Sequence, residues 1–410
     1  MGKYWLYLES YTMVFNKPQA AMFYNTISGQ HFKIEPDTLL SDIINQLQDS
    51  KNGYCIDVSE NDMENEKLIE FIRLLRDNFC GDIINQEFTG IKPYSLYPQY
   101  SVINGRERLL AGGAISIGEK VLDYLQYFTL QITGKCHLQC DSCPTLNRQI
   151  MTCSVLPLEM DISTIENTLI QLTGSPLKSI NIIGGNPFSY SWWEELISVL
   201  KRFPFEYTWH IDYRLLSGSD SKIEDMFSMD SQLVVIFQGD FDKVLLKKEY
   251  DKWKVNRISF NFHISSEKQY EDTLSFCEDS LIENYTVSPV YNSLNEDFFK
   301  EFIYIDEESI VGNTLSKKTI FANMNINKVN FGKIIVLADG EVYTNMNYPS
   351  LGNINNDSIH ELLVNEMRRG GSWFKIRDQK PCSDCLYQWL CPSPSNYEFV
   401  IGKSNLCHIR

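Results

Sequence analysis

The stretch FTLQITGKCHLQCDSC, residues 128–143, decides how this chain folds and which chemistry it carries. It begins with strand-forming residues, FTLQIT (128–133), and then places Cys136, Cys140 and Cys143 in one short loop. Thiolates spaced two to four residues apart reach the same metal centre, because a turn brings their sulfurs to one side. Three ligands leave one position of a four-iron cluster open to a small molecule.

Downstream of this stretch, strand-like runs alternate with helical ones. The further strand candidates are 178–185, 207–213, 232–238, 257–264 and 285–291. The helix candidates lie near 161–173, 191–202, 220–229, 241–251, 266–278 and 294–302. Repeated β-then-α units predict parallel strands with right-handed crossovers. Six units predict an α/β fold with a partial (β/α)6 barrel over 127–302, whose functional loops follow the carboxyl ends of the strands, where Cys136 lies.

Polar residues near the predicted strand ends are candidates for the barrel cavity, namely Asp212, Tyr213, Asn261 and Ser288. His210 and His263 also lie on predicted strands, but hydrogen-bonded core histidines are the commoner outcome, and we expect that here.

A second cysteine group lies in the tail, in the run CSDCLYQWLCP…NLC. Its members are Cys382, Cys385, Cys391 and Cys407. Four thiolates are a complete ligand set, and by ligand count alone both zinc and an iron–sulfur cluster are open. Ahead of the tail, 332–345 predicts a hairpin with Asp339-Gly340 as its turn, and a short helix is expected near 357–366. The other cysteines stand alone and are interpreted as small buried apolar residues: Cys55, Cys80, Cys153 and Cys277.

The N-terminal block is a small α+β domain. Its strand candidates are 4–8, 11–15 and 20–25, and its helix candidates are 37–47 and 64–76. The expected division of the chain is 1–95 for this domain, 96–126 for a linker, 127–302 for the barrel and 303–410 for a cysteine-rich C-terminal domain.

Composition narrows the class of protein. The chain has 410 residues, a formal net charge of -16 and 43% hydrophobic residues. An acidic chain lacks the positively charged surface that binds nucleic acids and membrane surfaces, so neither is an expected partner. The first residues do not resemble a signal peptide, and no apolar run approaches the roughly 20 residues of a membrane span. We therefore expect a cytoplasmic protein whose clustered cysteines bind metal rather than form disulfides.

The spacing C-x3-C-x2-C directly after a strand resembles the cluster loop of the radical S-adenosylmethionine (SAM) superfamily. The resemblance implies that Cys136, Cys140 and Cys143 hold a [4Fe-4S] cluster whose fourth iron binds SAM. It also implies reductive cleavage of SAM to a 5′-deoxyadenosyl radical, which abstracts a hydrogen atom from the substrate. A structural zinc site is the alternative, with His137 as the nearby fourth ligand, although His137 lies inside the tight loop.

The second predicted strand ends in Gly184-Gly185-Asn186-Pro187, where the family usually has Gly-Gly-Glu-Pro. The resemblance implies that the glycines let the backbone approach the SAM amino group. Asn186 replaces the acid that binds this group, and an amide oxygen accepts a hydrogen bond without charge assistance. Ser142 stands where the family usually places an aromatic residue near adenine. Both changes weaken the expected SAM site, and neither removes a cluster ligand.

The tail pattern C-x2-C-x5-C with a distant cysteine resembles the SPASM domain of peptide-modifying radical SAM enzymes. That family has seven cysteines serving two auxiliary clusters, and the three that are missing here belong with the first. The resemblance therefore implies one auxiliary [4Fe-4S] cluster, held by Cys382, Cys385, Cys391 and Cys407. A zinc site with four thiolates stays the alternative.

Residues 1–95 resemble the small PqqD-like domain, which binds a leader peptide by adding it as a strand to an exposed sheet edge. The resemblance implies that the strand around 20–26 is that edge and that the helix near 64–76 flanks the leader. A purely stabilising subdomain is the alternative.

Taken together, residues 120–410 resemble a radical SAM/SPASM peptide maturase, and LYQWLCPSPSNYE resembles a group from Bacteroidota peptide-modification systems, near the pseudo-radical-SAM/SPASM proteins. The resemblance implies an enzyme that forms a cross-link, thioether or epimer in a ribosomally synthesised precursor peptide with a leader. Further implied partners are a reductant such as flavodoxin or ferredoxin and a partner maturase. The alternative function is a catalytically inactive, cluster-bearing, peptide-binding partner of another radical SAM maturase.

Overall fold

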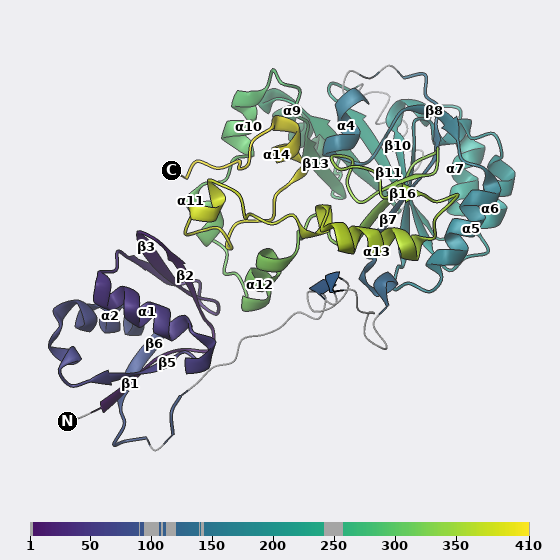
Figure 1. Cartoon of the computed structure of the whole chain (residues 1–410). Coiled ribbons are helices and arrows are strands. Elements are labelled where there is room, and N and C mark those ends of the chain that lie inside the picture. The colour runs from purple at the N-terminus through teal and green to yellow at the C-terminus, as the bar shows by residue number, and fades with distance from the viewer. Residues whose placement is uncertain are drawn as a thin grey trace.

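The computed structural model describes residues 3–89, 91–93, 106–107, 110–111, 120–138, 140, 143–241 and 257–409. Its architecture is mixed α/β, with one large sheet that is mainly parallel and two small antiparallel sheets near the N-terminus (Figure 1). Ser142, nearly all of the helix expected near 241–251 and most of the linker expected over 96–126 lie outside the described residues.

The N-terminal part contains the three predicted strands and both predicted helices. Its elements are β1 (Lys3–Leu8), β2 (Thr12–Lys17), β3 (Ala20–Asn25), β4 (His31–Ile34), α1 (Thr38–Gln48), β5 (Cys55–Ser59), α2 (Glu66–Asp77) and β6 (Gly81–Asn85). The strands form two sheets, in the orders β5-β1-β6 and β2-β3-β4. The expectation that the strand around 20–26 is a sheet edge is wrong, because β3 pairs with β2 on one side and with β4 on the other.

The large sheet contains all six strands predicted between residues 127 and 302. They are β7 (Tyr127–Gly134), β9 (Ser179–Gly184), β10 (Glu206–Asp212), β11 (Ser231–Gln238), β12 (Ile258–Ile264) and β13 (Tyr285–Pro289). They lie side by side in this order and pair in parallel, as the alternation of strands and helices predicts. Their closure into a barrel of six units stays a prediction.

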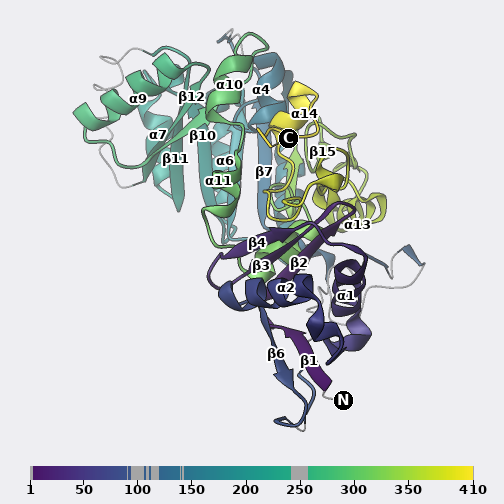
Figure 2. The same cartoon turned by 90° about the vertical axis from the view of Figure 1, so that its left-hand side faces the viewer.

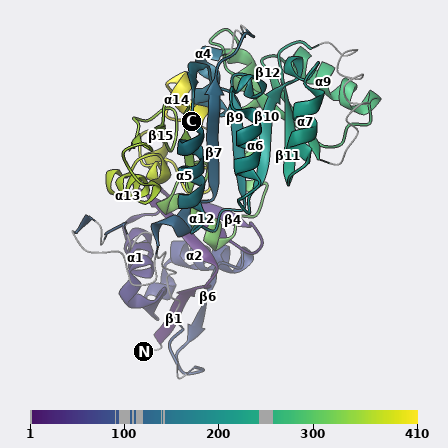
Figure 3. The ribbon, with the colours of Figure 1, turned by 90° about the vertical axis from the view of Figure 1, so that its right-hand side faces the viewer.

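Helices cover one face of this sheet (Figure 3). The helices that follow its strands are α5 (Ile162–Leu172), α6 (Trp193–Leu200), α7 (Asp220–Phe227), α9 (Glu267–Asp279) and α10 (Glu296–Phe302). Side chains alternate along each strand, so on β10 Trp209 and Ile211 join the main hydrophobic core, and His210 and Asp212 point to the opposite face. The face away from the main core therefore receives the polar side chains.

The C-terminal part extends the same sheet. Its strands and helices are β14 (Lys333–Val336), β15 (Glu341–Tyr343), β16 (Gly352–Asn353), α11 (Glu307–Val311), α12 (Lys317–Asn325), α13 (Ile359–Arg369) and α14 (Asn396–Ile401). The predicted hairpin and the helix expected near 357–366 are confirmed, and β14 also pairs in parallel with β7, which the sequence did not predict. A short strand, β8 (Leu156–Glu159), pairs antiparallel with the carboxyl end of β7.

The remaining elements are short. Helix α4 (Cys143–Gln149) follows the cysteine loop. The 3-10 turns are Ser50–Asn52, Asp62–Glu64, Val121–Tyr124, Pro187–Ser189, Tyr213–Leu215, Ser372–Phe374 and Cys382–Asp384. None of the helices that the structure describes is long and apolar enough to cross a membrane.

The sheet β2-β3-β4 lies against the C-terminal part of the chain (Figure 2). The contact has its own hydrophobic core, in which Met13, Phe15, Met22 and Tyr24 pack with residues of α11, α12 and the tail. One of those tail residues is Cys391. The N-terminal sheet is therefore packed directly beside the second cysteine group.

Candidate functional site

The upstream cysteines lie just beyond the carboxyl end of β7, where parallel sheets place functional loops. Leu138 N donates to Sγ of Cys136 at 3.3 Å, and Cys143 N donates to the carbonyl of Cys140 at 3.1 Å. Burial raises the pKa of Cys143 to about 11, and the adjacent Cys140 and Cys136 thiols act in the same direction. The three thiols therefore lie together in one loop, as their spacing predicts.

The end of β9 packs on this loop. Asn186 N donates to the carbonyl of Lys135 at 2.7 Å. A Cβ at Gly185 would lie 2.6 Å from that carbonyl oxygen and 2.7 Å from Cβ of Cys136, so only glycine allows the contact. The position of Gly185 thus brings the two strand-end loops together.

The neighbouring predicted residues serve a local turn. A Cβ at Gly184 would lie 3.1 Å from Cγ of Pro187 and 2.8 Å from a backbone oxygen of β7. Oδ1 of Asn186 accepts a hydrogen bond from Phe188 N at 3.1 Å and caps the 3-10 turn Pro187–Ser189. The amide oxygen that was expected to face SAM is therefore already engaged.

A guanidinium group lies beside the loop and was not predicted from the sequence. Nη2 of Arg214 lies 3.0 Å from Sγ of Cys140. Asp212 holds the same guanidinium, with distances of 2.8 Å to Nε and 2.7 Å to Nη2. The hydrogen bond with Asp212 raises the pKa of Arg214, so Arg214 places a permanent positive charge next to a thiol. Of the pair Arg214 and Asp212, the sequence indicated only Asp212, as a polar residue near the end of a predicted strand.

A fourth thiol lies near the three predicted ones. The adjacent segment is held to the sheet by Gln131, whose Nε2 donates to the carbonyl of Ser154 at 2.5 Å. Burial raises the pKa of Cys153, and Cys143, Cys136 and Cys140 raise it further. The sequence did not indicate that Cys153 lies near enough to these three thiols for them to influence its pKa.

The polar face of the sheet carries two neutral histidines. Burial lowers the pKa of His210 to about 4 and that of His263 to about 4, so neither ring is charged at pH 7. Nε2 of His210 lies 3.2 Å from Oδ1 of Asn181. Neither ring nitrogen of His263, which is 3% exposed, has a hydrogen-bond partner among the described residues. The expectation of a satisfied core histidine is thus wrong for His263, and a buried ring without hydrogen bonds is uncommon in folded proteins.

The four tail cysteines line one cavity of about 1000 Å³, which residues of the β2–β3 hairpin also border. Cys385 N donates to the carbonyl of Cys382 at 3.1 Å and closes a 3-10 turn. Cys407 is placed by backbone pairing with Ile305, whose carbonyl accepts from His408 N at 2.9 Å. The structure therefore brings together the distant cysteine and the three that are close in sequence.

The tail thiols influence one another. Burial raises the pKa of Cys391 to about 12; Arg377 acts in the opposite direction, and the other three tail thiols raise the pKa further. In the described part of the chain, no three His, Cys, Asp or Glu side chains converge as a single metal ion requires. Zinc holds four sulfurs at about 2.3 Å each, and the tail thiols are not gathered that closely in the described chain.

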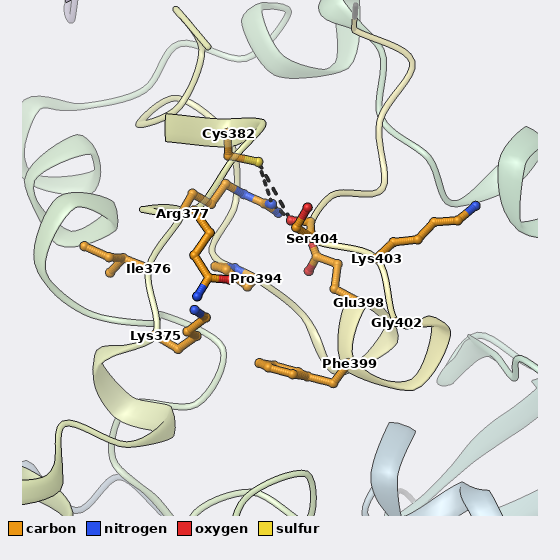
Figure 4. Close-up of a pocket in the computed structure, with 11 residues that line it drawn as sticks. Lys375, Ile376, Arg377, Cys382, Pro394, Glu398, Phe399, Gly402, Lys403 and Ser404 are labelled. Atoms are coloured by element: carbon orange, nitrogen blue, oxygen red, sulfur yellow. Dashed lines mark hydrogen bonds and ion pairs between the residues drawn. The ribbon is translucent and has the colours of Figure 1, made fainter. Parts of the chain in front are cut away.

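Several cations line this cavity, among them Arg377 and Lys17. Nη1 of Arg377 lies 2.7 Å from Oε1 of Glu398 and 3.7 Å from Sγ of Cys382, beside a smaller pocket of about 320 Å³ (Figure 4). Nζ of Lys17, at the end of β2, donates to the carbonyl of Ser383 at 2.6 Å. Neither cation was predicted. Arg377 lies near the cysteines in sequence, whereas no local pattern could have indicated Lys17.

No protein-family model and no curated protein matches the sequence. Among solved structures, the chain is similar to Streptococcus suis SuiB bound to S-adenosylmethionine, with 14% identity, a TM-score of 0.49 and coverage of 98% of this chain and 97% of that chain. It is also similar to SuiB bound to precursor peptide SuiA, with 13% identity, a TM-score of 0.48 and the same coverage. A third SuiB structure is matched at 13% identity and a TM-score of 0.48, over 98% of this chain and 100% of that chain.

Proposed function

We propose that this chain is a radical SAM enzyme that modifies a ribosomally synthesised precursor peptide. The observation that carries the proposal is the gathering of Cys136, Cys140 and Cys143 in one loop beyond β7, against which the end of β9 packs. Three thiols suit a [4Fe-4S] cluster with one iron left open. Such a cluster supplies, when bound, the electron that cleaves SAM and generates the radical that abstracts hydrogen.

The residues around the loop have separate roles in this proposal. Arg214, fixed by Asp212, places a positive charge beside the sulfur of Cys140. Gly185 keeps the two strand-end loops in contact. The polar face of the sheet receives the peptide, and the neutral ring of His263 exchanges hydrogen bonds with it without adding charge.

The tail cysteines form the second part of the proposal. Cys382, Cys385, Cys391 and Cys407 would hold one auxiliary [4Fe-4S] cluster. What supports this is that all four line one cavity and that each of the others influences the pKa of Cys391. Four protein ligands leave no iron open, so this site is suited to relaying electrons from a reductant such as flavodoxin or ferredoxin.

The N-terminal domain is the proposed site for the leader of the precursor. An extended peptide joins a sheet at an edge strand, and the edges of the sheet β2-β3-β4 are β2 and β4. On β2, the carbonyl of Val14 already accepts from Nε2 of Gln48 at 3.1 Å. We therefore assign the leader to the edge of β4.

The test is SAM cleavage by anaerobically purified, reconstituted protein with dithionite. We expect the wild type to form 5′-deoxyadenosine and Cys140→Ala to form none. Cys277→Ala removes a buried thiol outside both groups and is the matched control, which should retain turnover. Absence of 5′-deoxyadenosine from the wild type, with its cluster loaded and precursor present, would contradict the proposal.

One observation favours a second function, that of a non-catalytic, peptide-binding partner of another maturase. Oδ1 of Asn186 already accepts a hydrogen bond from Phe188 N and caps a turn. In this second proposal, the loop would hold a cluster but bind SAM weakly, because that oxygen is the group expected to meet the SAM amino group. The discriminating result is a loaded cluster without measurable SAM binding.

A further inference from the structure

Lys17 connects the N-terminal domain to the tail cysteines. It is the last residue of β2, and its Nζ donates to the carbonyl of Ser383 and to Oε1 of Gln388, both at 2.6 Å. Ser383 lies in the turn between Cys382 and Cys385. An ammonium group from a distant part of the chain therefore holds the turn that carries two of the four thiols.

The same lysine reaches the other side of the site through Gln388. Nε2 of this buried glutamine donates to the carbonyl of Arg377 at 2.6 Å. Nη1 of Arg377 in turn lies 3.7 Å from Sγ of Cys382. Lys17, Gln388 and Arg377 thus form one connected set of polar contacts around the thiols.

The charges of these residues are not equivalent. Arg377 is neutralised by Glu398 at 2.7 Å, and the nearby Asp384 is paired with Lys380 at 3.3 Å. Within the described part of the chain, Lys17 forms no ion pair with a carboxylate. Among the described Lys and Arg side chains that line the cavity, Lys17 is therefore the one with no carboxylate in direct contact.

We propose that Lys17 sets the reduction potential of the tail site and so couples that potential to the docking of the N-terminal domain. The inference rests on the proposed auxiliary cluster. One electron from dithionite converts [4Fe-4S]2+ to [4Fe-4S]+, and no bond forms or breaks. Reduction adds a negative charge, which a nearby cation and hydrogen bonds to the ligand loop stabilise. Lys17 is a positioning residue, since it acts through the turn and the field rather than as a ligand.

The coupling runs in both directions, because linkage between two equilibria is reciprocal. A peptide that shifts the β2–β3 hairpin changes the distance from Lys17 to the cysteines and with it the fraction of reduced cluster. Conversely, reduction of the cluster tightens the contact between the two parts of the chain. Met22 and Tyr24 pack with Cys391 in one hydrophobic cluster, so a movement of the hairpin is felt directly at the tail thiols.

The test is a redox titration, followed by electron paramagnetic resonance, of full-length protein in a Cys140→Ala background, which leaves the tail cluster as the signal. Lys17→Met should lower the ratio of reduced to oxidised cluster at a fixed potential roughly tenfold, which equals about 59 mV for one electron. Lys17→Arg keeps the positive charge and should retain most of the wild-type reduction potential. Lys17→Gln is a second neutral variant, chosen because its polar side chain should disturb folding least.

Lys317→Met is the matched control. Nζ of Lys317 donates to the carbonyl of Ser10 at 2.6 Å, so it also joins the two parts of the chain but lies away from the cysteine cavity. This variant should leave the potential unchanged. An intact cluster with the wild-type potential in both Lys17→Met and Lys17→Gln overturns the inference alone. Parent protein with no reducible tail cluster overturns both the inference and the proposed auxiliary cluster.

Discussion

Replacing Arg377 by methionine should destabilise the tail strongly, because it breaks a buried ion pair from one side. The side chains of Arg377 and Glu398 are 8% and 5% exposed, and their closest atoms lie 2.7 Å apart. Nε of Arg377 also donates to the carbonyl of Pro392 at 2.5 Å. Removing one partner of such a pair leaves an uncompensated buried charge and costs about 3–5 kcal/mol.

Native-state hydrogen exchange measures this loss locally, which suits a chain of several parts that need not unfold in one step. The amides of Gly402 and Lys403 both donate to the carbonyl of Glu398 at 3.0 Å and report on the end of α14. A cost of about 3–5 kcal/mol corresponds to exchange that is roughly 10²- to 10⁴-fold faster, at about 1.4 kcal/mol for each tenfold change.

Two variants make the result specific to the buried pair. The double variant Arg377→Met/Glu398→Gln should recover part of the loss, because no buried charge remains. Arg73→Met breaks an exposed ion pair with Glu70 in another part of the chain and should leave the two amides unchanged. Acceleration of less than about tenfold in Arg377→Met, which is about 1.4 kcal/mol, would refute the reasoning.

Three further predictions concern stability. Glu366 is 2% exposed, and burial raises its pKa above the ordinary value of 4.5. The wild type therefore loses folding stability as the pH rises from 4.5 through the raised pKa, because the buried carboxyl becomes charged. Glu366→Gln should therefore gain stability over the wild type at pH 8 and gain less at pH 4.5, in denaturant titrations; an equal difference at both pH values would contradict this. Met22→Ala should cost about 2–5 kcal/mol and expose the β2–β3 hairpin to limited proteolysis, and a protease-resistant variant would count against the described contact. Ser358→Ala removes the hydroxyl that accepts from Glu361 N at 3.2 Å and should destabilise α13 by about 1 kcal/mol in hydrogen exchange, whereas unchanged exchange would argue against the capping box.

Local sequence patterns predicted the six parallel strands β7 and β9 to β13, because each is a short run of β-branched and aromatic residues between helical segments. The short strands β8 and β16 of the same sheet were not predicted. Such patterns could not assign the pairing partners of strands outside this alternation. The composition of strand 20–25 is compatible with either an edge strand or a central strand of a sheet. It is central because it also pairs with β4, a strand that was not predicted. The pairing of β14 with β7 likewise joins segments that are distant in the chain.

The same limit applies to the sites. The spacing of the cysteines indicated which thiols lie together, since ligands close in sequence share a loop. The surrounding charges come from elsewhere: Arg214 reaches Cys140 from the end of β10, and Lys17 reaches the tail from the N-terminal hairpin. Contacts of this kind are set by the tertiary fold, so a single sequence carries no local signal for them.

The central claim is that the chain holds two clusters, one on the three loop thiolates and one on the four tail thiolates. Its most direct test is the content of iron and sulfide per chain after anaerobic reconstitution. The wild type should hold about eight irons and eight sulfides, and Cys140→Ala and Cys385→Ala should each hold about four. A wild-type protein with about four irons, or one that binds zinc at the tail in place of iron and sulfide, would contradict the account.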